Sequence, residues 1–233
     1  MHINHMTLNR KIHDLKRELS GRYHLEEERH NICGRNLAIT CVADAEALFS
    51  KMVFGDPDSL EVKDERLPYW ATLWGSALAL AHAILTCDLV KPGEAALELG
   101  CGLGLASAIA ALKRARMTVS DYQPDALKFA RLNCLQISGQ DPETCLLDWR
   151  EPPQDRQYAL LLGADLVYER RFFDPLINTF ESLLAPGGRI LFAEPNRMFG
   201  KPFFDKLEES HWVFAPVLES EDGTVYKIGR TPA

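Results

Sequence analysis

The chain has 233 residues, of which 46% are hydrophobic and 25% charged, and it carries a formal net charge of −7 at pH 7. This length suits one domain with an appendage, because single hydrophobic cores stop growing at roughly 250–300 residues. The mild acidity argues against nucleic acid or an anionic membrane as partner, and no apolar stretch reaches the roughly 20 residues that a membrane span needs.

Residues 1–66 form a polar N-terminal extension. Apolar side chains recur at helical spacing near its start: Leu8, Ile12, Leu15 and Leu19. This spacing predicts an amphipathic helix that ends near Gly21 and packs on its own domain. Two short apolar segments, 36–42 and 60–62, suggest a small strand pair in front of the main fold.

The first residues lack the apolar core of a signal peptide, and the six cysteines form no C-x-x-C pair. We therefore expect free thiols in a cytoplasmic protein. Five of the seven histidines precede Arg66, but none are paired at the i, i+4 spacing that places two ligands on one helical face. No metal site is expected.

From Leu67 onward, apolar segments of strand length alternate with segments of helical periodicity. The predicted strands are 95–99, 117–120, 144–147, 159–164 and 189–193. Strands that are apolar throughout are typical of a parallel sheet covered by helices on both faces. Two later segments, 212–218 and 224–229, are separated by the turn residues Asp222-Gly223 and predict a terminal hairpin. The fold class is therefore α/β, doubly wound, ending in a hairpin.

The first of these strands leads into a glycine-rich turn with the sequence ELGCGLG, residues 98–104. Gly100, Gly102 and Gly104 permit a tight turn and close approach of a ligand to the backbone. The dinucleotide pattern G-x-G-x-x-G is not met, because Leu105 stands where it requires its third glycine, and an NAD-dependent oxidoreductase is accordingly disfavoured. Glu98 would repel a pyrophosphate but suits a ligand with an ammonium group.

Acidic residues also end the next two strands. Asp121 follows the glycines by about 20 residues, the spacing at which an acid binds ribose hydroxyls, although it can also cap the following helix. Asp148 and Trp149 end the third strand and offer an acid for an exocyclic amine and an indole face for a purine. We expect these acids to gather with Glu98 at one edge of the sheet.

The segments ELGCGLG, SDYQP, LLDW, GADLVY and LAPGGRILF occur in the order found in seven-β-strand methyltransferases, and residues 67–230 resemble that family. The resemblance implies a domain over 67–233 with a mostly parallel seven-stranded sheet of order 3-2-1-4-5-7-6, its last strand antiparallel. It also implies S-adenosylmethionine as cofactor and S-adenosylhomocysteine as product. The cofactor residues carried over by these motifs are Glu98, Gly100, Gly102, Gly104, Asp121, Tyr122, Asp148, Trp149 and Ala164.

Two further segments, PYWATLWGSALALA at 68–81 and DLVY at 165–168, are similar to methyltransferase family 16, whose members mostly methylate protein lysines. The first is particularly similar to the subgroup that contains the electron-transfer-flavoprotein β-subunit lysine methyltransferase. The resemblance implies Asp165 and Tyr168 as catalytic residues and places Trp74 beside the cofactor, where a core position is equally compatible. Trp70 is expected in the core.

These expectations combine into a function. Methyl transfer from a sulfonium is an in-line displacement that depends on alignment. Asp165 would orient a neutral lysine amine, and Tyr168 would face the cation. The predicted partner is a protein substrate; alternatives are a small-molecule N-methyltransferase and a non-catalytic cofactor-binding scaffold. By analogy with related methyltransferases, the extension 1–66 is predicted to be a lid or a substrate-docking element.

Overall fold

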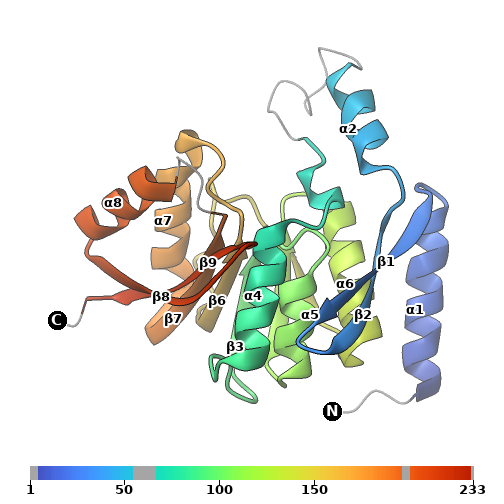
Figure 1. Ribbon diagram of the computed structural model, residues 1–233, viewed down its shortest axis with the longest axis horizontal. Coiled ribbons are helices and arrows are strands. Elements are labelled where there is room, and N and C mark those ends of the chain that lie inside the picture. Colours follow the sequence, from blue (N-terminus) through green and yellow to red (C-terminus); the bar gives the residue numbers. More distant parts are fainter. Residues whose placement is uncertain (1–4, 55–66, 196–199, 232–233) are drawn as a thin grey trace.

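The computed structural model describes residues 5–54, 67–195 and 200–231. Seven strands form one sheet in the order β5-β4-β3-β6-β7-β9-β8 (Figure 1). In chain order they are β3 (Ala95–Leu99), β4 (Arg116–Asp121), β5 (Glu143–Leu146), β6 (Tyr158–Ala164), β7 (Leu184–Glu194), β8 (Trp212–Ser220) and β9 (Gly223–Arg230). Strand β9 is antiparallel to both of its neighbours. Counted from β3, the order is 3-2-1-4-5-7-6 with the last strand antiparallel, which confirms the predicted sheet.

Helices cover both faces of the sheet (Figure 1). On one face lie α4 (Gly75–Thr86), α5 (Leu105–Leu112) and α6 (Pro124–Ser138), and on the other α7 (Phe173–Leu183) and α8 (Gly200–Glu209). Leu160 and Leu162 of β6 pack in the core with α4 and α5, whereas Leu161 packs in the core with α7 and α8. Because neither face of β6 meets water, its sequence is apolar throughout.

Strand β7 begins earlier than predicted. Leu184 pairs with Tyr158 ahead of an irregularity in register, so the strand also includes the Pro-Gly-Gly segment that precedes the predicted strand 189–193. The predicted terminal hairpin is confirmed by the pairing of β8 with β9.

The N-terminal extension contains α1 (His5–Ser20), β1 (Leu25–Ile32), β2 (Arg35–Val42) and α2 (Ala45–Val53). Helix α1 packs against α6 and buries Leu15 and Leu19, which confirms the predicted helix and its packing on its own domain. Strand β2 confirms the predicted segment 36–42, but its partner is β1. Strand β1 was not predicted because half of its residues, 26–29, are charged and exposed; the predicted partner 60–62 lies outside the described residues.

Within the described ranges, none of the helices has the length and hydropathy required to cross a membrane. All six cysteines lie in these ranges and are free thiols, as predicted.

Candidate active site

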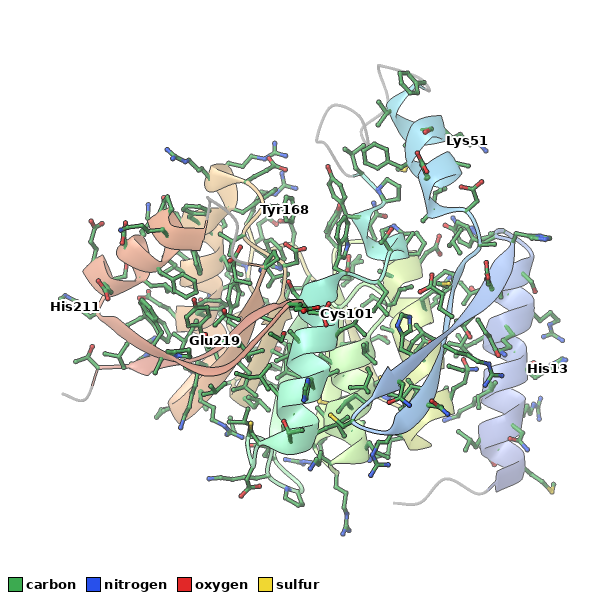
Figure 2. The ribbon with its side chains drawn as sticks, in the orientation of Figure 1. His13, Lys51, Cys101, Tyr168, His211 and Glu219 are labelled. Carbon is green, nitrogen blue, oxygen red and sulfur yellow. The ribbon has the colours of Figure 1, made fainter. Side chains whose placement is uncertain are left out.

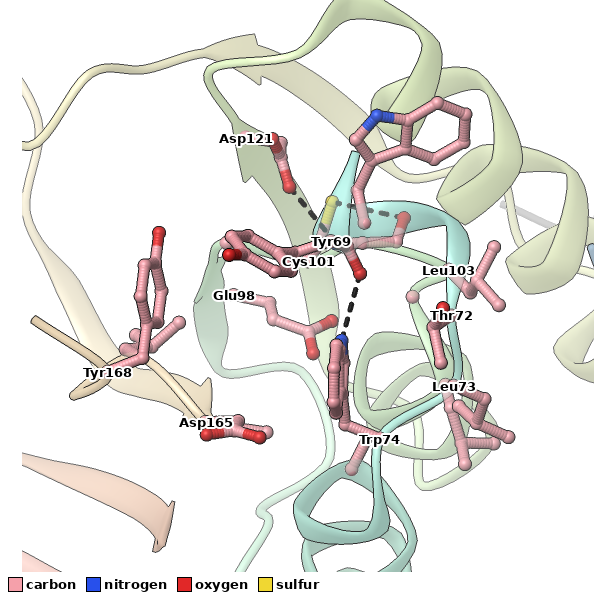
Figure 3. Close-up of a pocket in the computed structure, with 18 of the residues that line it drawn as sticks. Tyr69, Thr72, Leu73, Trp74, Glu98, Cys101, Leu103, Asp121, Asp165 and Tyr168 are labelled. Atoms are coloured by element: carbon pink, nitrogen blue, oxygen red, sulfur yellow. Dashed lines mark hydrogen bonds between the residues drawn. The ribbon is translucent and has the colours of Figure 1, made fainter. Parts of the chain in front are cut away.

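A pocket of about 750 Å³, including space open to solvent, lies at the carboxyl ends of β3, β4 and β6 (Figure 3). Its walls come from η1 (Tyr69–Ala71) and the start of α4, from the glycine loop 100–104, and from the segments after β5 and β6. The predicted site residues that line it are Trp74, Glu98, Gly100, Gly102, Gly104, Asp121, Tyr122, Trp149, Ala164, Asp165 and Tyr168. The pocket lies near the middle of the molecule, where Figure 2 labels Cys101 and Tyr168.

The glycine loop leaves no room for side chains at two of its positions. Gly100 has a φ of +57°, and a Cβ built there would lie 2.8 Å from Leu166 and 3.1 Å from Trp149. Gly104 has a φ of +73°, and its Cβ would lie 2.5 Å from that of Ala130 on α6. Left-handed backbone together with these close approaches requires glycine. The loop is therefore packed tightly against Leu166, Trp149 and α6 where it lines the pocket.

Two buried carboxylates occupy the floor of the pocket. Glu98 is 3% exposed and accepts a hydrogen bond from the Ser107 N–H at 2.9 Å. Its pKa is raised to about 7, chiefly by burial and also by the charge of Asp121, against the opposing effect of the Ser107 hydrogen bonds. This carboxylate lies beneath the part of the pocket that Figure 3 shows between Tyr69 and Trp74.

Asp121 accepts hydrogen bonds from the N–H groups of Gly102 at 3.1 Å and Gln123 at 2.9 Å. Burial nevertheless raises its pKa to about 6. Within the described part of the chain, neither Asp121 nor Glu98 has a lysine or arginine as ion-pair partner. The pocket therefore favours a ligand that brings a positive charge or several hydrogen-bond donors.

The two predicted site residues after β5, Asp148 and Trp149, differ in position, and only one of them lines the pocket. Trp149 lines the pocket, and its ring meets that of Phe172 edge-on with centroids 5.7 Å apart. Asp148 does not line it: the Arg150 guanidinium binds this carboxylate, with Nη2 2.5 Å from Oδ2. The Arg150 contact is bidentate and engages both oxygens of this carboxylate. The structure therefore brings together the predicted residues other than Asp148.

The loop after β6 supplies Asp165 and Tyr168. Asp165 has a φ of +56°, uncommon for a residue with a side chain, and its N–H donates to the Ala193 carbonyl at 3.0 Å. Burial, with the nearby Tyr122 hydroxyl and acidic groups, raises the pKa of Tyr168 far above its usual range. Tyr168 is therefore a neutral phenol at physiological pH.

Tyr69 is a pocket residue to which the sequence analysis gave no role. Its ring lies 5.6 Å from that of Tyr168 and 6.3 Å from that of Trp74, and its carbonyl accepts the Trp74 indole N–H at 2.9 Å. Figure 3 shows Tyr69 and Trp74 facing Tyr168 and Asp165 across the pocket. The signal that could have identified Tyr69 is its place in the aromatic segment Tyr69-Trp70, directly ahead of Trp74. Trp70 itself is buried against Phe129, which confirms the predicted core position.

Comparisons with known proteins agree with this architecture. Among solved structures, the fold is similar to that of magnesium protoporphyrin IX methyltransferase from Synechocystis PCC 6803 with bound S-adenosylmethionine. The TM-score is 0.54 and the sequence identity 15%, with 82% of this chain and 99% of that chain covered. The fold is thus that of the S-adenosylmethionine-dependent methyltransferases, and the predicted class of enzyme is confirmed.

The family follows from the sequence comparison. The model of the lysine methyltransferase family matches residues 56–210, and the chain belongs to this family. The electron transfer flavoprotein beta subunit lysine methyltransferase of Danio rerio is 30% identical over 132 residues, which cover 56% of this chain but only 51% of that protein. The EEF1A lysine methyltransferase 3 of Mus musculus is 29% identical over 206 residues, covering 86% of this chain and 80% of the relative.

Proposed function

We propose that this enzyme transfers a methyl group from S-adenosylmethionine to the side-chain amine of a lysine in a protein. The observation that carries the proposal is the arrangement of Asp165, Tyr168, Tyr69 and Trp74 around one pocket that also contains two buried carboxylates. The names of the two relatives, both lysine methyltransferases with protein substrates, support the same acceptor.

The residues on the floor of the pocket fit the cofactor. Glu98 would bind its ammonium group and Asp121 its ribose hydroxyls. These groups would add a positive charge and further donors to two buried carboxylates that accept hydrogen bonds from backbone N–H groups. The glycine loop allows the ligand to approach the backbone, and Trp149 offers a flat apolar surface to the adenine. When bound, S-adenosylmethionine supplies an electrophilic methyl group on a sulfonium.

The remaining residues act on the acceptor. Asp165 would accept a hydrogen bond from the incoming amine and so orient the lone pair of the amine nitrogen. Asp165 suits this role because it lines the pocket and its backbone is fixed by the bond to Ala193. The neutral rings of Tyr168 and Tyr69 would flank the alkyl chain and stabilise the positive charge that develops on nitrogen. Alignment of this kind accounts for most of the rate in a displacement without acid–base chemistry.

The N-terminal extension also reaches the mouth of the pocket. The ring of Phe49 on α2 lies 5.7 Å from that of Tyr69, and Val53 at the end of the same helix is 39% exposed. These contacts support a docking role for α2 in the extension 1–66, beside a catalytic domain over 67–233. The free cysteines support the cytoplasm as the location of the enzyme.

Transfer of a labelled methyl group to a cell lysate tests the proposal. After incubation with the enzyme and labelled S-adenosylmethionine, we expect label in a discrete protein band and on lysine after hydrolysis. Label confined to the small-molecule fraction would contradict the proposal and favour the alternative of an N-methyltransferase for free amines. Binding of the cofactor without any transfer would indicate the scaffold alternative.

The matched variant for this assay is Asp165→Asn. Asparagine tolerates the left-handed backbone at this position, whereas alanine would add strain to the loop. We expect Asp165→Asn to bind S-adenosylhomocysteine as the wild type does and to lose about 100-fold or more in transfer, the range for a positioning group at the reacting atoms. Transfer at the wild-type rate would remove Asp165 from the mechanism.

A further inference from the structure

The side chain of Asn133 connects the β1–β2 hairpin to the glycine loop. Asn133 lies in the middle of α6 and is fully buried. Its Oδ1 accepts the Thr40 N–H at 2.8 Å, and its Nδ2 donates to the carbonyls of Thr40 at 3.0 Å and Leu103 at 2.9 Å. A buried amide is stable only when such groups are paired, so all three bonds matter for its position.

On the side of the hairpin, the Asn133 amide makes the hydrogen bonds that a neighbouring strand would make to β2. Thr40 belongs to the buried half of β2, whose other edge pairs with β1. Asn133 both accepts from and donates to the backbone of Thr40, as the peptide group of an adjacent strand would. The hairpin is thereby held on α6, beside which β2 lies in Figure 1.

On the side of the glycine loop, Asn133 binds the carbonyl of Leu103, whose two neighbours are glycines. Leu103 lines the pocket and stands between Gly102 and Gly104, both of which have left-handed backbone. Glycine loops have many accessible conformations, so a bond to the intervening carbonyl reduces the freedom that a ligand must otherwise remove.

A second connection reaches the same loop from another side. Tyr23, just after α1, donates to the Asp125 carboxylate at 2.5 Å, and its ring meets that of Trp70 at 5.8 Å. The Trp70 carbonyl lies against Gly102, 3.3 Å from a Cβ built there. The extension therefore packs behind the cofactor loop at two places.

We infer that Asn133 is a positioning residue for the cofactor loop and that the β1–β2 hairpin is a supporting part of the S-adenosylmethionine site. This inference rests on the proposed role of the glycine loop in cofactor binding. The β1–β2 hairpin would thus support cofactor binding, whereas α2 would help to dock the acceptor. Binding of the cofactor in the pocket then stabilises the hairpin, and an ordered hairpin strengthens cofactor binding.

Two matched substitutions on α6 test the link. Asn133→Leu keeps the branched shape of the side chain and removes all three bonds. Gln136→Leu removes the contacts of Gln136 with the Thr40 hydroxyl and with Glu27 on the hairpin, and it leaves the bond to the loop in place. We expect Asn133→Leu to raise the Kd for S-adenosylhomocysteine and the KM for S-adenosylmethionine about tenfold, with kcat at saturating cofactor within about twofold of wild type. Gln136→Leu should stay within about twofold in both.

Hydrogen exchange on the wild type keeps the inference testable if Asn133→Leu does not fold. Saturation with S-adenosylhomocysteine should slow exchange of the amides in 37–42, none of which lines the pocket. Unchanged exchange there, or a folded Asn133→Leu with unaltered cofactor affinity, would overturn the inference. Failure of the wild type to bind the cofactor would instead overturn the proposed function.

Discussion

Replacing Glu98 by glutamine should stabilise the ligand-free enzyme while weakening cofactor binding. Burial raises the pKa of Glu98 from its ordinary value of 4.5 to about 7, so the ionised carboxylate destabilises the folded state above pH 7. The difference between these pKa values corresponds to about 3 kcal/mol in the free energy of unfolding. Because the folded-state pKa is raised, stability is fully present below pH 4.5 and falls as the pH rises through about 7.

Thermal unfolding at pH 5 and pH 8 measures this effect. At pH 8, Glu98→Gln should raise the Tm of the ligand-free protein by up to about 10 °C, and at pH 5 the two proteins should differ little. Calorimetry should show cofactor affinity reduced about 10- to 100-fold by the loss of a charge-assisted contact. Equal stability at pH 8, or destabilisation of the same size at both pH values, would refute the reasoning.

Glu94 is the matched control because its carboxylate has the opposite energetics. Burial acts to raise its pKa, but hydrogen bonds from Arg189, at 2.7 Å and 2.9 Å, and from Lys91 lower it overall. Glu94→Gln should therefore destabilise the protein at pH 8 and leave cofactor affinity unchanged, since Glu94 does not line the pocket. Reduced affinity in this variant would show that the assay reports general destabilisation.

Three further predictions concern the pocket. The ligand favours ionised Glu98 and ionised Asp121, whose pKa values are about 7 and about 6 in the free enzyme. Calorimetric affinity for the cofactor should therefore fall as the pH drops below 7, and more steeply below 6; a flat profile from pH 5 to 8 would contradict this. Tyr168→Phe should keep the rate of methyl transfer within about tenfold of wild type, because the ring makes the cation–π contact. Tyr168→Ala should lose more, and the Kd for the cofactor should be unchanged in both variants. Equal losses of transfer would assign the function to the hydroxyl. Gly104→Ala should lower the free energy of unfolding by about 3 kcal/mol or more in denaturant, because its Cβ would meet the backbone of α6. Gly187→Ala has the same left-handed backbone but open space around the Cβ, so it should lose only about 1 kcal/mol. Similar losses in the two variants would exclude the steric argument.

The centre of the sheet was predictable from the sequence because its strands there are buried on both faces. Strand β6 shows this directly, since Leu160, Leu161 and Leu162 all lie in cores and leave an uninterrupted apolar signal. Strand β1 carries no such signal: residues 26–29 are charged and exposed, and the strand exists because its backbone pairs with β2. Periodicity cannot detect a strand whose stability comes from its partner.

The candidate site was predictable where chemistry follows local motifs. Glu98 and Asp121 end adjacent parallel strands, so their meeting at one edge follows from the topology. Tyr69 and Asn133 were missed because their roles depend on contacts with residues distant in the chain, Tyr168 and Thr40. Asp148 was predicted from its strand end, but it does not line the pocket, and its carboxylate is bound by Arg150.

Peptide mass spectrometry of a lysate treated with the enzyme and heavy-methyl S-adenosylmethionine tests the central claim most directly. We expect heavy methyl groups on lysine in one or a few proteins with the wild type, and none above background with Asp165→Asn. Heavy methyl groups only on small molecules, or on other amino acids, would contradict it.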